Sequence, residues 1–191
     1  MTQLQEVSDL ASSEAKEPNV PNSEGFDSAA IFAALDALPK ESTAREIRAA
    51  CVGLIRSEQK RVNENIATRF LASPTRAYGT IRAYSDLTDD VVCTIFKVAT
   101  DYLHPLPNPT ASERISLVAV GGYGRAEMAP FSDVDLLFLS PWKLTPWAES
   151  VIESMLYILW DLKLKVGHAS RTVKECLRLG REDYTLSLIH I

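Results

Sequence analysis

The sequence is short of the residues that build disulfide frameworks and zinc sites. Its 191 residues include three cysteines and three histidines, and the cysteines, at positions 51, 93 and 176, are far apart with no Cys-x-x-Cys pair. An odd number of widely spaced cysteines argues against a disulfide-stapled module and against a structural zinc site. We therefore expect reduced thiols, which are typical of a cytoplasmic protein.

Long apolar runs and a surplus of basic residues are also missing. No stretch approaches the roughly 20 apolar residues of a membrane span, and the N-terminus has neither a basic region nor an apolar signal core. The net charge of -5 argues against a dedicated nucleic-acid binder, although a local phosphate site needs no positive total. We expect a cytoplasmic protein without membrane or nucleic-acid partners.

What is present is enough apolar material for a domain, because 46% of the residues are hydrophobic. Residues 1–28 are polar and predict a disordered tail. Residues 29–111 predict a helical N-terminal region, and residues 112–185 predict an α/β core. The chain is therefore expected to have a helical part followed by a mixed part.

Capping signals mark the helices of the N-terminal region. Thr43 and Glu46 form a capping box in front of a long amphipathic pattern. Residues 91–103 repeat the helical pattern, and Asp86 or Thr88 is the expected cap of that helix. Both helices are predicted to bury one apolar face.

The core also shows start and stop signals. A helix is expected to begin at Thr145, residues 162–171 predict a strand, and Thr172 and Glu175 form a second capping box before a helix that Gly180 closes. Four aromatic side chains around the first of these helices are expected to pack in the core rather than to stack on bases: Trp142, Trp147, Tyr157 and Trp160.

The chemistry lies in residues 115–139, ISLVAVGGYGRAEMAPFSDVDLLFL. This segment predicts a strand, a glycine-rich turn and a second strand that begins with Asp133 and Asp135. Residues i and i+2 of a strand project from the same face, so both carboxylates point to one place. Mg²⁺ (or Mn²⁺) is the expected cofactor, because such a cation is typically held by one or two carboxylates together with substrate phosphates. The alternative is a buried hairpin whose turn acids are merely exposed.

The residues between the two strands offer donors for phosphate groups. Gly121 and Gly122 have no side chain, so their backbone approaches a phosphate closely. Arg125 and Ser132 add side-chain donors. Arg171 is a further candidate, because it lies beside a predicted helix start, where anions are commonly bound.

The spacing of a double glycine, about ten residues and Asp-x-Asp resembles the nucleotidyltransferase superfamily that includes DNA polymerase beta. The longer run GGYGRAEMAPFSDVDLLFL is similar to one branch, the bacterial PII uridylyltransferase and uridylyl-removing enzymes. The block LWDLKLKVGHASRTVKECL, residues 159–177, resembles the same branch. The resemblance implies an α/β (α+β) fold, with a small mixed sheet flanked by helices, and makes residues 112–185 the nucleotidyltransferase core.

This resemblance implies a complete enzyme that transfers UMP from UTP to a tyrosine of the PII protein and releases pyrophosphate when glutamine is scarce. Asp133 and Asp135 are then the catalytic and metal-binding residues. Domains absent from this chain, a phosphohydrolase and paired glutamine-sensing modules, would remove the UMP and report nitrogen status. The expected partners are UTP, PII and, through the absent domains alone, glutamine.

The sequence does not decide the roles of Asp161 and His168, and it leaves two alternative functions. Many members of the superfamily have a third carboxylate on the next core strand, but residues 162–171 contain no acid, and the nearest is Asp161. His168 is expected either to contact the nucleotide or to cap a turn. The rival functions are another nucleotidyltransferase, which would adenylylate a protein or modify a small molecule, and a non-catalytic regulatory or binding fragment of the same fold. Use of UTP rather than ATP distinguishes the uridylyltransferase from the first of these rivals.

The C-terminus departs from the family pattern. Members of this branch continue into further helices, whereas this chain ends with LSLIHI after residue 185. These six residues resemble the translation of a sequencing-library adapter. Residues 186–191 are therefore expected to be a non-native tail, on the truncated front part of a longer protein.

Overall fold

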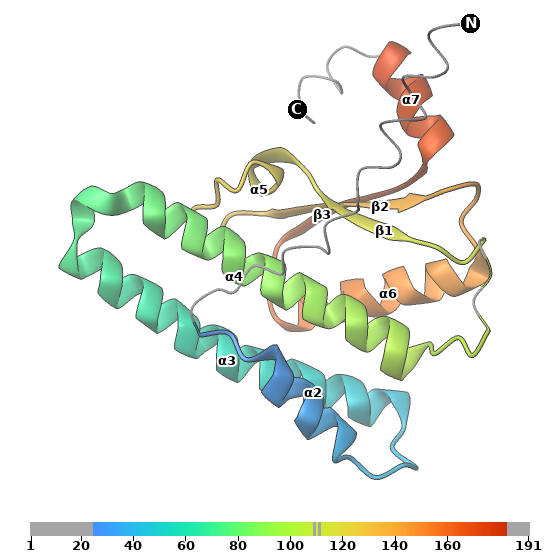
Figure 1. The fold of residues 1–191 in the computed structure, drawn as a ribbon, viewed down its shortest axis with the longest axis horizontal. Helices are drawn as coiled ribbons and strands as arrows, with labels where there is room; N and C mark the ends of the chain where they lie inside the picture. Colours follow the sequence, from blue (N-terminus) through green and yellow to red (C-terminus); the bar gives the residue numbers. More distant parts are fainter. Residues whose placement is uncertain (1–24, 109, 111, 183–191) are drawn as a thin grey trace, which may run out of the picture.

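The computed structural model describes residues 25–108, 110 and 112–182 (Figure 1). Most of the predicted N-terminal tail and all of the predicted non-native tail lie outside these residues. The described part confirms the predicted α/β class, with helices packed on a three-stranded sheet. None of its helices combines the length and the apolar character that crossing a membrane requires.

The N-terminal part is a set of packed helices. Helices α2 (Ser28–Asp36), α3 (Ala44–Ala72) and α4 (Ala77–Lys97) follow one another, with a short 3-10 turn η2 (Pro74–Arg76) before α4 and a π-helical turn η3 (Val98–Leu103) after it. Figure 1 shows α3 and α4 as a long hairpin, with α2 against α3. The core of this hairpin contains fully buried residues such as Cys51, and burial raises the pKa of that thiol to about 12.

One predicted helix start is right and the other is wrong. The Thr43 side chain accepts from the Glu46 amide at 3.3 Å, and the Glu46 carboxylate accepts from the Thr43 amide at 2.8 Å, which confirms the capping box. Helix α4 begins at Ala77, well before the predicted caps. The Thr88 hydroxyl caps nothing, because it donates to the Tyr84 carbonyl one turn earlier in the same helix.

The C-terminal part is built on strands β1 (Ser116–Ala119), β2 (Val134–Ser140) and β3 (Val166–Thr172). Strand β2 lies in the centre, antiparallel to β1 and parallel to β3. Helix α6 (Pro146–Asp161) connects the two parallel strands. Figure 1 shows α4 and α6 on the same side of the sheet.

Strand β2 alternates between two environments, as a strand with one covered face must. Residues 134, 136, 138 and 140 are buried toward the helices, whereas residues 135, 137 and 139 are half-buried on the opposite side. We call that opposite side the open face of the sheet. The predicted Asp-x-Asp strand start therefore places Asp135 on the open face.

Two boundaries in this part differ from the prediction. Strand β3 begins at Val166 rather than at residue 162, because residues 162–165 close helix α6: the Leu164 amide donates to the Leu159 carbonyl at 3.1 Å, and Lys163 has a positive φ of 66°. Helix α7 (Val173–Glu182) begins at the predicted capping box but passes through Gly180.

The prediction that four aromatic side chains pack in the core is wrong for three of them. Trp147 is half-buried, and its indole donates to the His104 carbonyl at 2.8 Å. Trp142, Tyr157 and Trp160 are 76%, 44% and 46% exposed. Tyr157 and Trp160 form an edge-to-face pair on the surface of α6.

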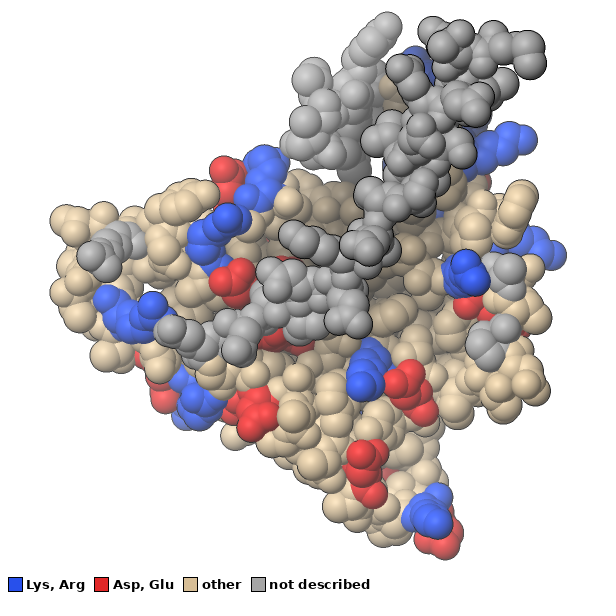
Figure 2. Space-filling model, in the orientation of Figure 1, with Lys and Arg blue, Asp and Glu red and all other residues tan. Residues whose placement is uncertain are grey.

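Basic and acidic side chains are interspersed over the face of the molecule seen in Figure 2. Among the described residues, several ion pairs join side chains of opposite sign, such as Arg61 with Glu58 on α3 and Arg125 with Glu127. On the described part of this face, charges of both signs are therefore mixed rather than gathered into one field.

Candidate active site

The Asp135 carboxylate lies between two glycines. Asp135 on β2 is the register partner of Gly167 on β3, and its carbonyl accepts from the Val120 amide at 3.0 Å, which brings Gly121 to its other side. A Cβ atom on Gly121 would lie 2.8 Å from Asp135 Oδ2, and one on Gly167 would overlap Oδ1. With the Asp135 side chain in this conformation, neither position has room for a Cβ atom.

The predicted glycine turn is a single helical turn, α5 (Gly121–Gly124). Gly121 has a positive φ of 64°, a backbone conformation that residues other than glycine adopt only with strain. A Cβ on Gly124 would lie 2.6 Å from the Ala119 carbonyl oxygen, so the turn presses against the end of β1. At Gly122 the nearest atom to a Cβ is 3.5 Å away, so packing alone does not require glycine there.

Tyr123 anchors the turn to the helical layer. Its side chain is 5% exposed, and its hydroxyl donates to Asp89 Oδ1 of α4 at 2.6 Å. Burial raises the pKa of Tyr123, and burial also raises the pKa of Asp89, an effect that the hydrogen bond from Tyr123 partly offsets. The sequence analysis missed this pair, although a tyrosine inside a glycine run was a visible signal.

Replacing Tyr123 by phenylalanine is expected to destabilise the chain by about 1–3 kcal/mol at neutral pH, because a part-buried carboxylate loses its donor. Loss of that donor raises the pKa of Asp89 further, so the folded variant binds a proton more readily than the unfolded one. The difference from the parent protein should therefore shrink as the pH falls and Asp89 becomes protonated. Thermal unfolding of both proteins at a series of pH values from 7 to 4 measures this difference in stability.

The control for this experiment is Tyr78→Phe. Tyr78 is 65% exposed, and its hydroxyl makes no hydrogen bond within the described residues. Its replacement should change the melting temperature little at any pH. A Tyr123→Phe protein that is as stable as the Tyr78→Phe protein at pH 7 would contradict the anchoring role.

The structure places two of the predicted phosphate donors beside the turn, each already hydrogen-bonded. Arg125 Nη1 donates to the Gly121 carbonyl at 3.0 Å, and its Nε donates to Glu127 Oε2 at 3.0 Å. The Ser132 hydroxyl accepts from the Ala129 amide at 3.0 Å and thereby shapes the loop before β2. The serine keeps its own proton for donation, whereas the arginine would exchange one partner for a phosphate oxygen.

Asp133 is exposed and directly precedes β2, two residues before Asp135. Within residues 25–108, 110 and 112–182, no three His, Cys, Asp or Glu side chains are close enough together to hold a metal ion. A two-carboxylate set fits an ion that completes its shell with substrate phosphates, as Mg²⁺ usually does, and does not fit a closed structural site.

Asp161, the nearest acid to the third strand, does not join this pair of carboxylates. It ends α6, where its carboxylate is 3.8 Å from Arg48 Nε and its carbonyl accepts from Arg56 Nη2 at 2.7 Å. Both arginines come from α3. Asp161 therefore ties the end of α6 to α3.

The remaining two candidates lie away from Asp135. His168 is the register partner of buried Leu136, so it is on the helix-facing side of the sheet, opposite to the carboxylate. Arg171 is on the open face, but four residues beyond Gly167 on β3, which corresponds to roughly 13 Å along the strand. The structure thus gathers Gly121, Gly122, Arg125, Ser132, Asp133 and Asp135 at one end of the sheet and leaves Arg171 toward the other.

A glycine turn packed against paired strand-start carboxylates, on the open face of a small mixed sheet, is typical of the nucleotidyltransferase class that the sequence resembles. The comparisons with known proteins are more specific. The chain is homologous to the N-terminal portion of bifunctional uridylyltransferase/uridylyl-removing enzymes. No protein-family model and no solved structure matches it.

Three relatives show the extent of the homology. The chain is 56% identical to the enzyme of Ruegeria pomeroyi over 162 residues, 67% identical to that of Cereibacter sphaeroides over 124 residues, and 42% identical to that of Azospirillum brasilense over 170 residues. These matches cover 84%, 65% and 88% of this chain but only 18%, 13% and 18% of the relatives. The chain thus spans less than a fifth of the length of these enzymes.

Proposed function

We propose that this chain carries the nucleotidyl-transfer site of an enzyme that moves UMP from UTP to a tyrosine hydroxyl of the bacterial PII signalling protein. The observation that carries the proposal is the Asp135 carboxylate, enclosed by Gly121 and Gly167 beside the glycine turn. The homology to uridylyltransferases supports the choice of UMP and UTP. The reaction would belong to cytoplasmic nitrogen regulation.

In the proposed reaction, the tyrosine oxygen attacks the α-phosphorus of UTP in line with the bond to the β-phosphate. That bond breaks, pyrophosphate leaves and the tyrosine proton passes to solvent. Asp133 and Asp135 would hold Mg²⁺ or Mn²⁺, which supplies charge neutralisation for the triphosphate and for the leaving pyrophosphate. The absence of side chains at Gly121 and Gly167 leaves room for the Asp135 carboxylate in this conformation, in which its oxygens would be positioned for this role.

The rest of the site would orient the triphosphate. The turn at Gly121 and Gly122 brings backbone close to the phosphates, and the Arg125 guanidinium lies over that turn through its bond to the Gly121 carbonyl. Ser132 would donate its hydroxyl proton from the loop before β2. Arg171 would meet only an extended ligand or an acceptor protein, because it is further along the open face.

Transfer of label from UTP tests the proposal directly. The chain is mixed with PII and with UTP labelled at the α-phosphate, and the label on PII is measured with Mg²⁺ and with an excess of EDTA. We expect labelling with Mg²⁺ and none with EDTA, because two carboxylates alone do not replace the ion. Chelation that leaves labelling unchanged would exclude this mechanism.

The same assay separates the rival functions. With labelled ATP in place of UTP, we expect no transfer to PII. Labelling by ATP alone would indicate an adenylylating enzyme of the same class. Failure with both nucleotides, in the chain and in the complete enzyme that contains it, would indicate a non-catalytic fragment of this fold.

A further inference from the structure

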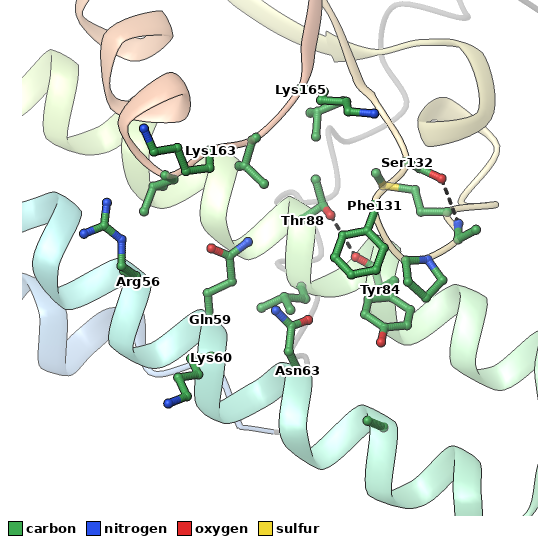
Figure 3. A pocket seen from close by; sticks show the side chains of 18 of the residues that line it. Arg56, Gln59, Lys60, Asn63, Tyr84, Thr88, Phe131, Ser132, Lys163 and Lys165 are labelled. Carbon is green, nitrogen blue, oxygen red and sulfur yellow. Dashed lines mark hydrogen bonds between the residues drawn. The ribbon is translucent and has the colours of Figure 1, made fainter.

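A cavity of about 650 Å³ lies on the helix-facing side of the sheet, away from the carboxylate pair. It is bounded by α3, α4, the loop of residues 128–132 and the turn of residues 162–165 (Figure 3). Val134 lines it from β2, and its side chain points to the opposite side of the sheet from Asp135. The cavity has the size of a small-molecule site. Ser132, in the loop before β2, also lines it and is the residue that it shares with the proposed site of UMP transfer.

The lining divides into an aromatic end, a basic end and a polar stretch between them. Figure 3 shows Phe131 and Tyr84 at one end, Arg56 and Lys163 at the other, and Gln59 and Asn63 rising from α3 between them. The floor is apolar, with contributions from Leu87, Met128, Val134, Leu162 and Leu164.

Several polar groups of the lining have no partner among the described residues. Within the described residues, the side chains of Gln59, Asn63 and Lys163 make no hydrogen bond or ion pair. Lys165, at the upper edge in Figure 3, is equally unpaired among them. The side-chain amides of Gln59 and Asn63 can donate and accept hydrogen bonds with a ligand, and the two lysine ammonium groups can pair with an anion.

The backbone is strained on two sides of this cavity. Phe131 and Lys163 have positive φ values of 68° and 66°, and within the described residues only Ala126 among the other non-glycine residues does so. The closure of helix α6 accounts for the φ of Lys163. The Phe131 side chain is 95% exposed, so packing does not explain its conformation. Strained residues of this kind concentrate at ligand sites.

We propose that this cavity binds a nucleotide independently of divalent metal and of the Asp133–Asp135 site. The base would lie against the Phe131 ring, its polar edge would meet Gln59 and Asn63, and the phosphate would pair with Lys163 and Arg56. Among the described residues, Glu64 is the one acidic side chain that lines the cavity, and it pairs with Lys60 at 3.9 Å. The phosphate group of a bound nucleotide would therefore meet little repulsion from carboxylates. Its place between α3, α4 and the loop leading to Asp133 suits a regulatory ligand of the transfer site.

Isothermal titration of the chain with AMP and with UMP in excess EDTA tests this proposal. We expect saturable binding of at least one of them, unchanged in the Asp135→Asn variant. Adenosine or uridine alone and inorganic phosphate alone should each bind at least about tenfold more weakly, because each lacks one half of the recognition.

Two variants locate the site. Lys163→Asn and Phe131→Asn each remove one recognition group while keeping a residue that tolerates positive φ. Each should weaken nucleotide binding about tenfold or more, by loss of a charged hydrogen bond or of base stacking. Lys143→Asn and Trp142→Asn, which alter an exposed lysine and an exposed tryptophan just after the C-terminal end of β2, should not. Melting temperatures show that all four proteins are folded.

The proposal is overturned by the absence of saturable binding in EDTA, by binding that both cavity variants retain in full, or by binding that Asp135→Asn abolishes. The first two results do not bear on UMP transfer, which needs the metal, and the third would place the bound nucleotide at the transfer site instead. Conversely, an inactive transfer site would leave metal-free nucleotide binding in this cavity intact.

Discussion

Asparagine in place of Asp135 is expected to abolish UMP transfer and to leave the fold intact. The side chain keeps its size, so it still fits between Gly121 and Gly167, where no Cβ atom has room. It loses the negative charge that would hold the metal ion. Several kcal/mol of charge stabilisation in the transition state are then lost, which corresponds to a decrease in rate of roughly a thousandfold or more.

The measurement is incorporation of α-labelled UMP into PII, with circular dichroism and the melting temperature of the chain as checks of the fold. Asp161→Asn is the matched control. Asp161 pairs with Arg48 and does not approach the two carboxylates, so this variant should retain transfer at nearly the parent rate. Full activity of Asp135→Asn would remove Asp135 from the mechanism, and loss of activity in Asp161→Asn would restore that residue as the third carboxylate.

Alanine at position 167 is expected to impair transfer far more than it impairs stability. Its Cβ atom would overlap Asp135 Oδ1, which is the end of a side chain that can rotate away. The fold accommodates the change by turning Asp135 out of its place, while the backbone pairing of β2 and β3 stays. Misplacement of a reacting group by about 1 Å costs around a hundredfold in rate, and we expect at least that loss.

Transfer rate and melting temperature, measured on the same preparations, distinguish the two effects. Gly53→Ala and Gly180→Ala are the controls, since a Cβ atom at either position meets nothing within 4 Å. Both lie in helices, where alanine is favoured over glycine by up to about 1 kcal/mol, so both variants should be active and at least as stable as the parent. A fully active Gly167→Ala protein would show that the position of Asp135 does not matter for the reaction.

Much of the local structure was predictable because it depends on neighbours in the chain. The capping boxes at Thr43 and Thr172 each close through a glutamate three residues on, so the helix starts of α3 and α7 were visible in the sequence. The start of α4 was not, because residues 77–90 carry no capping signal at Ala77 and continue directly from the η2 turn. Likewise, closure of α6 at residues 162–165 competes with strand formation there, and the closure prevails.

The candidate site was predictable to a lesser degree. The double glycine and the Asp-x-Asp strand start are contiguous patterns, so Gly121, Asp133 and Asp135 could be named from the sequence. Arg171 was also named, but distance along β3 separates it from the others. The Tyr123 bond to Asp89 joins segments that no sequence pattern connects.

The sequence by itself determined the class of fold, the paired carboxylates and the resemblance to uridylyltransferases, since these follow from periodicity, spacing and contiguous motifs. Only the tertiary structure decided that Gly167 is the register partner of Asp135, that Asp161 pairs with Arg48 of α3, and that a cavity lies on the helix-facing side of the sheet. Each of these depends on strand register and helix packing between distant segments. Register is chosen by burial of the whole β2 face against α4 and α6, a property that no single stretch of sequence contains.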